Sequence, residues 1–421
     1  MIMMKRLSLM LALLLCLLSF SIAAAEQSRD IVLDMAVLKQ YENITSLCWV
    51  DETLYMLGTG GVYQWSEGSA QPTRMLDLSA ASQYAYRETP PDGNEELQSW
   101  QKAIRFLFSD GTKLYGLHPS SGQIYYISSD VMKPVAQIPP DLLSVQSGDT
   151  PFFREIKSIA GNSENLCLLL GTNDYNDYEK TELITFSIDD HSLIKSTLQA
   201  VQSIASGAKG KLLLYTSGED GGIWQYEPIT DTCEQKLSTL HAGESLNGLA
   251  WFGEKNAPVY YAANRVCLVE SSDIIAIKAY LPISFTTANT GAVCSASGLY
   301  AYPYGQYVFI RDISQAEPAA QTVLKIIGDF SPQTMIGFTI ENPDIAIVNA
   351  STSIGDFLQQ ATITVDESMD LFVVAAPGDY ADIRNKGFAE PLNGDDELVR
   401  MAKELYPTIH PRRFFGTSGT G

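Results

Sequence analysis

The stretch Ile104–Asp130 reads "IRFLFSDGTKLYGLHPSSGQIYYISSD" and contains three short runs in which apolar and polar residues alternate. These runs are "IRFLFSD", "KLYGLHP" and "QIYYISS", and Gly, Asp or Ser residues separate them. Alternation with a period of two is typical of a strand with one buried face, and the small separators favour tight turns. The stretch therefore predicts three short antiparallel strands joined in chain order.

The same triplet of strands recurs along the first three hundred residues. Its six copies begin at Ile44, Ile104, Ile156, Val201, Leu246 and Gly291. The last five starts are 45 to 52 residues apart, and the gap of 60 residues after Ile44 holds the insertion "QYAYRETPPDGNEELQSW". Several copies add a fourth strand, such as "KPVAQIP" or "IIAIKAYLP". A four-stranded unit repeated at this period predicts a β-propeller over residues 30–316.

The six copies predict six blades. A single four-stranded sheet leaves both of its faces uncovered, whereas sheets stacked in a ring cover one another's faces and leave only short edges exposed. The sixth copy lacks its outer strand, and "DIVLDMAV" at Asp30–Val37 precedes the first copy. We expect this N-terminal segment to complete the last blade and close the ring. A ring of seven blades and a pair of β-sandwiches are the alternatives.

Residues 1–25 predict a signal peptide. Lys5 and Arg6 form a basic start, Leu7–Ile22 is apolar or small, and Ala23–Ala25 fits a cleavage site. The apolar run is shorter than the roughly 20 residues of a spanning helix, although an uncleaved anchor is the alternative. The mature protein is therefore expected to be secreted, extracellular and associated with the cell envelope.

The net charge of the chain is −21, and it becomes −23 when Lys5 and Arg6 are removed with the leader. Such an acidic chain argues against nucleic acid and against anionic membranes as partners. Five cysteines remain after the leader, mostly in apolar strand-like runs, and their odd number leaves at least one thiol free. We interpret them as small buried hydrophobic residues rather than as a disulfide framework.

No stretch predicts an active site, a metal site or a cofactor. The four histidines are far apart in the sequence and have no ligand-spaced partner. "SGEDGGIWQY" at Ser217–Tyr226 is one residue off the Asp-box spacing of sialidases, so we interpret it as a hairpin turn with a packing aromatic residue. The acidic run Asn173–Glu182 lacks the Gly and Glu of a calcium loop and is interpreted as a hairpin tip. The chain is therefore expected to be non-catalytic, with a propeller hydrolase as a further alternative.

The pattern changes after "SQAEPAAQ" at Ser314–Gln321, which is a plausible linker. The apolar runs "TVLKIIG", "DIAIVNA" and "DLFVVAA" alternate with helical patterns such as "TSIGDFLQQAT" and "DDELVRMAKELYP". Strands that alternate with helices predict a parallel α/β sheet. The expected fold class is thus mainly β plus α/β.

Residues 322–410 resemble the opening of lobe one in the sugar-type extracellular solute-binding proteins that feed bacterial ABC importers. The matching features are "TVLKII", "FTIENPDIAIV", "MDLFVV", "YADIRNKGFAEPL" and "ELYPTIH" in that order. The resemblance implies a partial periplasmic-binding-protein-like lobe, followed by a flexible tail at residues 411–421. The family has two lobes that hold the ligand between them, and only the start of one is present in this sequence.

Ligands of open α/β sheets bind outside the carboxyl ends of the strands. The loops there would supply Phe330 as an apolar contact, with Ser331 and Pro377 beside the ligand. Asn349 and Ser351 could donate hydrogen bonds to sugar hydroxyls. Ordinary βα connections with a helix cap are the alternative for each of these loops.

The leading functional hypothesis is capture of a solute, expected to be an oligosaccharide, for an ABC importer whose permease would be a partner. The resemblance implies this role. The alternative is an interaction module at the cell surface, in which the propeller face binds a protein or a glycan and the α/β segment is vestigial.

Overall fold

The computed structural model describes most of the chain from Ile31 to Asp312 and parts of the remainder. The described residues are 31–35, 43–147, 150–162, 165–171, 181–198, 200–217, 221–238, 246–262, 265–280, 291–304, 306–314, 322–328, 345–349 and 371–373, with the single positions 355, 383, 385 and 400. The predicted signal peptide and the C-terminal tail lie outside them. No helix among the described residues is long and apolar enough to cross a membrane.

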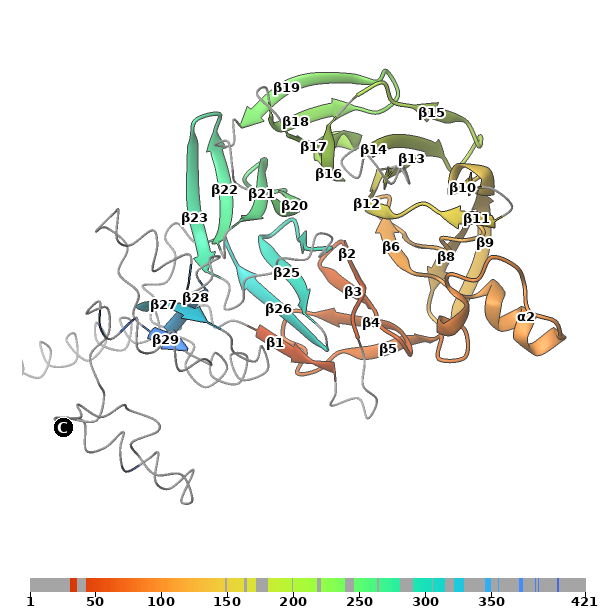
Figure 1. Cartoon of the computed structure of the whole chain (residues 1–421), viewed down its shortest axis with the longest axis horizontal. Coiled ribbons are helices and arrows are strands. Elements are labelled where there is room, and N and C mark those ends of the chain that lie inside the picture. The colour runs from red at the N-terminus through yellow and green to blue at the C-terminus, as the bar shows by residue number, and fades with distance from the viewer. Residues whose placement is uncertain are drawn as a thin grey trace, which may run out of the picture. The chain divides into compact units, whose positions relative to one another are not determined.

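Six four-stranded antiparallel sheets follow one another along the chain as the blades of a propeller (Figure 1). Blade 1 consists of β2 (Ser46–Val50), β3 (Thr53–Leu57), β4 (Gly61–Ser66) and β5 (Thr73–Asp77). Blade 2 consists of β6 (Phe106–Ser109), β7 (Leu114–Leu117), β8 (Gln123–Ser128) and β9 (Val131–Gln137). Blade 3 consists of β12 (Ile156–Asn162), β13 (Asn165–Gly171), β14 (Thr181–Ser187) and β15 (Leu193–Lys195).

The next two blades repeat the same order of strands. Blade 4 consists of β16 (Val201–Ser206), β17 (Leu212–Thr216), β18 (Gly222–Glu227) and β19 (Thr232–Ser238). Blade 5 consists of β20 (Asn247–Phe252), β21 (Ala257–Ala262), β22 (Arg265–Ser271) and β23 (Ile274–Tyr280). The predicted six-bladed β-propeller is confirmed by this strand pairing.

Blade 6 is assembled from the two ends of the propeller segment. Its first three strands are β24 (Val293–Cys294), β25 (Leu299–Tyr304) and β26 (Tyr307–Asp312), and its outer strand is β1 (Ile31–Asp34). β1 pairs antiparallel with β26, and Val32 stands opposite Phe309. The predicted closure by the N-terminal segment is therefore confirmed, and it leaves no blade with three strands.

The hydrophobic core lies between the blades rather than inside any one of them. Five core clusters each take residues from two neighbouring sheets, as Ile124 of blade 2 and Leu168 of blade 3 illustrate, and a smaller cluster lies within the first insertion. Similar clusters join blades 1 and 2, 3 and 4, and 4 and 5, and another joins blade 6 to blade 1 through Leu33 and Trp65. Stacking thus buries the apolar face that a lone blade would expose.

Two insertions interrupt the repeat. The first lies between β5 and β6 and contains η2 (Ser82–Tyr84) and α2 (Asn94–Gln101), a helix that the sequence pattern did not predict. The second lies between β9 and β12 and contains η3 (Pro140–Leu142) and the hairpin of β10 (Ser144–Ser147) and β11 (Thr150–Phe153). A single 3-10 turn, η4 (Ala208–Gly210), joins β16 to β17.

The chain divides into two compact units, and the second begins at Thr322. Its described strands are β27 (Thr322–Gly328), β28 (Ile345–Asn349) and β29 (Leu371–Val373), which pair in parallel in the order β28-β27-β29. The three predicted strands and their parallel pairing are confirmed. The helices that would make this sheet an α/β lobe lie outside the described residues, apart from single positions.

Candidate functional site

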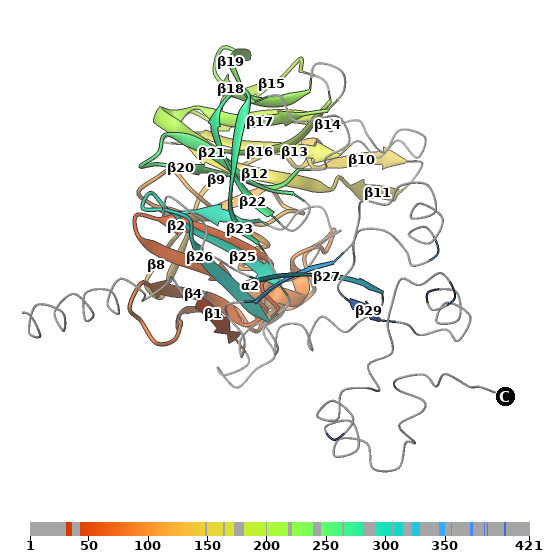
Figure 2. The same ribbon diagram turned by 90° about the vertical axis from the view of Figure 1, so that its left-hand side faces the viewer.

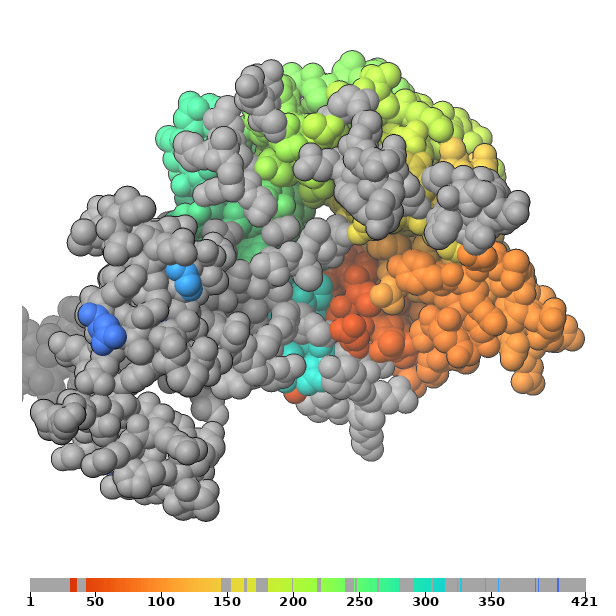
Figure 3. Space-filling model, in the orientation of Figure 1, coloured from red at the N-terminus to blue at the C-terminus, as the bar shows by residue number. Residues whose placement is uncertain are grey.

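A cavity of about 810 Å³ follows the axis of the propeller. The first strands of all six blades line it, namely β2, β6, β12, β16, β20 and β24. Figure 3 shows the molecule hollowed at the centre of the ring, between the red atoms of blade 1 and the yellow-green atoms of blades 3 and 4. The volume of the cavity falls in the range of roughly 300 to 1,000 Å³ that is usual for small-molecule sites.

The main chain itself supplies polar groups to this cavity. Each first strand has a paired neighbour on one side only, because it is the last in its sheet. Its other edge faces the axis and presents N–H and C=O groups that no ladder satisfies. Gly161 shows how closely these strands approach, since a Cβ added there would lie 2.2 Å from the Ser109 carbonyl oxygen.

Hydroxyl groups tie neighbouring first strands together. Leu107 N donates to Ser46 Oγ over 2.9 Å, which joins blade 2 to blade 1. Ser158 Oγ donates to the Ile204 carbonyl over 2.8 Å, and Ser206 Oγ donates to the Gly161 carbonyl over 2.6 Å. The small polar residues of the first strands therefore position the wall of the cavity as well as lining it.

These contacts also place residues of different blades at the same level of the axis. Ser46 lies level with Leu107, and Ser109, Gly161 and Ser206 are level with one another. The same register brings together Trp49 and Asp110, three residues beyond Ser46 and Leu107, and Asn162, one residue beyond Gly161. All three line the cavity. We call Trp49, Asp110 and Asn162 the axial layer.

Two polar atoms of the axial layer have no hydrogen-bond partner among the described residues: Trp49 Nε1 and Asn162 Oδ1. Asn162 is only 7% exposed. Its Nδ2 donates to the Gly210 carbonyl, so the amide oxygen is the atom left over. The Trp49 ring packs edge-on against Trp65, with ring centroids 6.5 Å apart.

Asp110 differs from its two neighbours because its carboxylate is already satisfied. It accepts hydrogen bonds from Thr112 N, Lys113 N, Thr112 Oγ1 and Tyr115 Oη at 2.7 to 3.0 Å. Partial burial would raise the pKa of Asp110, but these donors outweigh it and lower the pKa below its usual value. Asp110 therefore stays ionised and holds the β6–β7 turn in place.

The two cysteines in the cavity wall are unreactive. Burial raises the pKa of the Cys48 thiol to about 12, with a smaller contribution from the Asp110 charge. Burial also raises the pKa of Cys294. Both thiols are therefore protonated at neutral pH and poor nucleophiles. The five described cysteines are free, and Cys48, Cys167 and Cys267 are buried, as the sequence predicted.

The two ends of the cavity differ in the connections around them. Connections from a fourth strand to the next first strand, and from second to third strands, lie at one end, which we call the loop end. Both insertions belong to it, and Figure 2 shows the β10–β11 hairpin projecting on this side. The loop end of the cavity is lined by Thr45, Phe106, Lys157, Gln202 and Ser217. Gln202 Nε2 donates to Ser217 Oγ there, over 3.3 Å.

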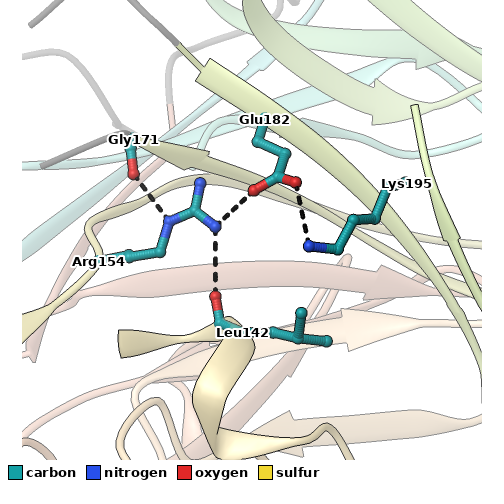
Figure 4. A network of polar contacts seen from close by, with 5 residues as sticks. All are labelled: Leu142, Arg154, Gly171, Glu182 and Lys195. Carbon is teal, nitrogen blue, oxygen red and sulfur yellow. Dashed lines mark hydrogen bonds and ion pairs between the residues drawn. The ribbon is translucent and has the colours of Figure 1, made fainter. Parts of the chain in front are cut away.

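An ion-pair network anchors the second insertion at the loop end (Figure 4). Arg154 Nη1 lies 2.6 Å from Glu182 Oε2 and also donates to the Leu142 carbonyl over 3.3 Å. Arg154 Nε donates to the Gly171 carbonyl over 3.1 Å, and Lys195 Nζ lies 3.5 Å from Glu182 Oε1. The network has its partners within the fold, so we assign it a structural role.

Four of the five residues predicted to bind a ligand, Phe330, Ser331, Ser351 and Pro377, lie outside the described residues, so this prediction stays a prediction. Asn349 is the last residue of β28, where its backbone stands opposite Ile326. The axial layer was not predicted, because each blade contributes one residue and no short motif contains them. Comparing equivalent positions of the six first strands would have found it.

Among the residues that the structure describes, no group of three or more His, Cys, Asp or Glu residues could hold a metal ion. Trp224 of "SGEDGGIWQY" packs against a core cluster, and its Nε1 donates to Thr216 Oγ1, as expected of a packing aromatic residue. Among the described lining residues of the cavity, the carboxylate is that of Asp110.

No protein-family model matches the chain, and no curated protein matches it. Among solved structures, the streptogramin B lyase structure is similar at 9% identity and a TM-score of 0.40, covering 67% of this chain and 97% of that one. The structure of YCF48 bound to D1 peptide has 10% identity and a TM-score of 0.38, covering 64% and 77%. PorZ of Porphyromonas gingivalis has 10% identity and a TM-score of 0.35, covering 72% and 42%. At these scores the six-bladed fold rests on the strand pairing described above.

Proposed function

We propose that this chain is an exported, non-catalytic interaction module of the cell envelope, whose propeller binds a protein or glycan partner at the axial cavity. The cavity is the observation that carries the proposal. It is large enough for part of a ligand, six strand edges offer it main-chain hydrogen bonds, and the longer connections surround one of its ends. Binding residues are commonly presented in this way, on loops held by a rigid scaffold.

Export supports the same proposal from the sequence side. The basic, apolar and small-residue pattern of residues 1–25 is that of a secretory leader. A mature protein with net charge −23, obtained as −21 minus the two cations of the leader, stays soluble outside the cell and is repelled by anionic surfaces. A partner that is neutral or basic suits this charge.

Gly291 offers a direct test, because it lines the cavity and an added Cβ would meet nothing closer than Leu47 N at 4.0 Å. Gly291→Trp should therefore fill the cavity without disturbing the blades. The purified mature chain, fluorescently labelled, would be titrated onto producing cells. Saturable binding that Gly291→Trp weakens at least tenfold, with Gly291→Ala unchanged, supports the proposal.

Two treatments of the cells then identify the partner. Loss of binding after protease treatment indicates a protein, and loss after periodate oxidation indicates a glycan. Absence of saturable binding, or equal binding by the two Gly291 variants, contradicts the proposal. Circular dichroism of both variants checks that the propeller is intact.

Solute capture for an ABC importer is a second candidate, and the second compact unit favours it. Its three strands pair in parallel in the order β28-β27-β29, as in the opening of an α/β lobe. Under this candidate Phe330, Ser331, Asn349, Ser351 and Pro377 contact an oligosaccharide. Ligand binding that survives Gly291→Trp and is lost in Asn349→Ala would favour this candidate over the first.

A further inference from the structure

In two of the first strands, a serine of the preceding blade binds a main-chain group of the inner edge. Leu107 N of β6 donates to Ser46 Oγ of blade 1 over 2.9 Å. Ile204 N of β16 donates to Ser158 Oγ of blade 3 over 3.4 Å. Both serines hold the third position of their repeat, and Leu107 and Ile204 hold the fourth. A third-position side chain therefore reaches the fourth-position main chain of the next blade.

The strand β2 has no such cap. Its fourth-position residue is Leu47, and the preceding blade places Val293 at the third position. Val293 packs against the core cluster that joins blades 6 and 1, so its side chain is directed toward blade 1, but it carries no hydroxyl group. Space is left beside Leu47 as well, because a Cβ added to Gly291 would meet no described atom closer than Leu47 N, at 4.0 Å.

The pairing of β2 with β3 turns alternate main-chain groups toward the cavity. The two-residue turn Asp51–Glu52 joins the strands, so Val50 and Thr53 form the hydrogen-bonded pair next to it. Bonded and non-bonded pairs alternate along an antiparallel ladder. Leu47 and Trp49 therefore direct their N–H and C=O groups away from β3, and both residues line the cavity. The Leu47 side chain belongs to the core, so it is its main chain that faces the cavity.

The other first strands offer less of an open edge. Those of β6 and β16 are capped as above, and the Gly161 carbonyl of β12 and the Gly248 carbonyl of β20 each accept a hydroxyl hydrogen bond. The strand β24 has two residues. Within the described structure, the inward main-chain groups of β2 have one weak contact, in which Cys48 Sγ donates to the Trp49 carbonyl over 3.6 Å. The open edge inside the cavity is thus that of β2.

An open strand edge selects its ligand by spacing. It presents an N–H and a C=O at every second residue, and another extended main chain presents the complementary groups at the same spacing. The wall asks for no particular charge beside β2. Among the described lining residues, the Asp110 carboxylate is engaged by its own turn, and Lys157 lies at the loop end.

We propose that the axial cavity binds an extended peptide segment of a protein partner, which pairs with the inner edge of β2 as an added strand. Leu47 and Trp49 exchange main-chain hydrogen bonds with this segment. The inference rests on the proposed function and specifies a protein, rather than a glycan, as the partner. It also gives a reason for Gly291, since a side chain there would occupy the place of the added strand.

The first test uses the purified chain and a synthetic library of random heptapeptides, acetylated and amidated so that their ends are uncharged. The tightest-binding peptide would be resynthesised in two forms, N-methylated at the odd or at the even amides, and titrated by calorimetry beside maltotriose. Alternate amides of an added strand bond to its neighbour. We therefore expect one form to bind at least tenfold more weakly than the other.

A pair of variants then locates the peptide at β2. Val293→Thr keeps the shape of the side chain and adds the hydroxyl that Ser46 and Ser158 supply to other blades. We expect it to cap Leu47 N and to weaken the peptide about fivefold, as for the loss of one net hydrogen bond. Val293→Ala is the matched control, because it trims the same side chain without adding a polar group, and it should change the affinity less than twofold.

Labelling with ¹⁵N-tryptophan follows the edge directly. The peptide should slow hydrogen exchange of the Trp49 main-chain amide and leave that of Trp224, outside the cavity wall, unchanged. Binding of no peptide, equal loss in the two N-methylated forms, equal binding by the two Val293 variants or an unchanged Trp49 amide would overturn the proposal. Tighter binding of maltotriose, lost in Gly291→Trp, would also overturn it while leaving the proposed function in place.

Discussion

The junction between blades 3 and 4 and the junction at which blade 6 closes the ring are built in different ways. Blades 3 and 4 are neighbours in the sequence, and side-chain hydroxyls join them. Thr181 Oγ1 donates to the Val201 carbonyl over 2.6 Å, and Ser158 and Ser206 form the two bonds described above. Each of these bonds contributes about 1 kcal/mol net.

Blades 6 and 1 meet where the chain must return to its own beginning. There the ring is closed inside blade 6, where the N-terminal strand β1 pairs with β26 along four residues. Gln306 Nε2 also donates to Asp34 Oδ1 over 3.3 Å, and Ser297 Oγ donates to Glu52 Oε2 over 2.7 Å. Side chains join the neighbouring blades at both places, but only at the closure does a main-chain ladder also join the two ends of the propeller segment, within blade 6.

Breaking the closing contact should have the largest effect. Leu33 of β1 is 4% exposed in the cluster that joins blades 6 and 1. Leu33→Asp places an unpaired charge there and should lower the free energy of unfolding by about 3–5 kcal/mol. Urea unfolding at pH 7, followed by tryptophan fluorescence, measures it. Val131→Asp, on an outer strand and 38% exposed, is the control. Equal losses in the two variants would mean that β1 does not close the ring.

Acid should weaken the fold at a place that belongs to neither contact. His118 of blade 2 is fully buried against Trp100 of α2, with ring centroids 4.8 Å apart. Burial lowers the pKa of His118 from 6.5 to about 4. The unfolded chain therefore takes up the proton first as the pH falls, so stability is complete above pH 6.5 and declines toward pH 4.

We expect this loss to reach about 3 kcal/mol, from about 1.4 kcal/mol for each unit of pKa difference. Because His118 is remote from both contacts in the ring, the loss should be the same in Leu33→Asp and in the wild type. His118→Phe should remove most of the slope between pH 6.5 and 4. A slope that persists in His118→Phe would assign the acid sensitivity to the carboxylates of the blades instead. Urea unfolding at several pH values provides the data.

Removing one hydroxyl between blades 3 and 4 should have the smallest effect. Thr181→Val keeps the shape of the side chain and leaves the Val201 carbonyl without its donor, which should cost about 1–2 kcal/mol. Thr73→Val on exposed β5 is the matched control and should be nearly neutral. A loss of unfolding free energy as large as that in Leu33→Asp would show that the two junctions contribute equally to stability, which would contradict the difference between them.

Most of the propeller could be predicted from the sequence because its strands are half-buried and alternate with a period of two. The alternation in "DIVLDMAV" even identified the closing strand. The helix α2 was missed, because the insertion is rich in Gln, Glu and Pro and the residue before the helix is Gly93 rather than a capping Ser, Thr, Asp or Asn. The β10–β11 hairpin was missed for a similar reason, since it interrupts the repeat without continuing it.

The candidate site could not be predicted in the same way. Trp49 and Asp110 are 61 residues apart in the sequence, Asp110 and Asn162 are 52 apart, and only the inter-blade register places the three at one level. Local patterns report which face of a strand is buried, but not which positions of separate sheets meet on an axis. The residues that the resemblance implied, such as Phe330 and Ser351, lie outside the described residues and stay predictions.

Hydrogen exchange of β1 tests the central claim, that the axial cavity is enclosed by a closed ring. Mass spectrometry of the native purified chain would compare the peptide covering residues 31–34 with peptides from β26 and from β13. If the ring is closed by β1, residues 31–34 exchange as slowly as β26, and Leu33→Asp accelerates both together. Exchange of residues 31–34 at the rate of an unfolded peptide, while β26 and β13 remain protected, would contradict the account.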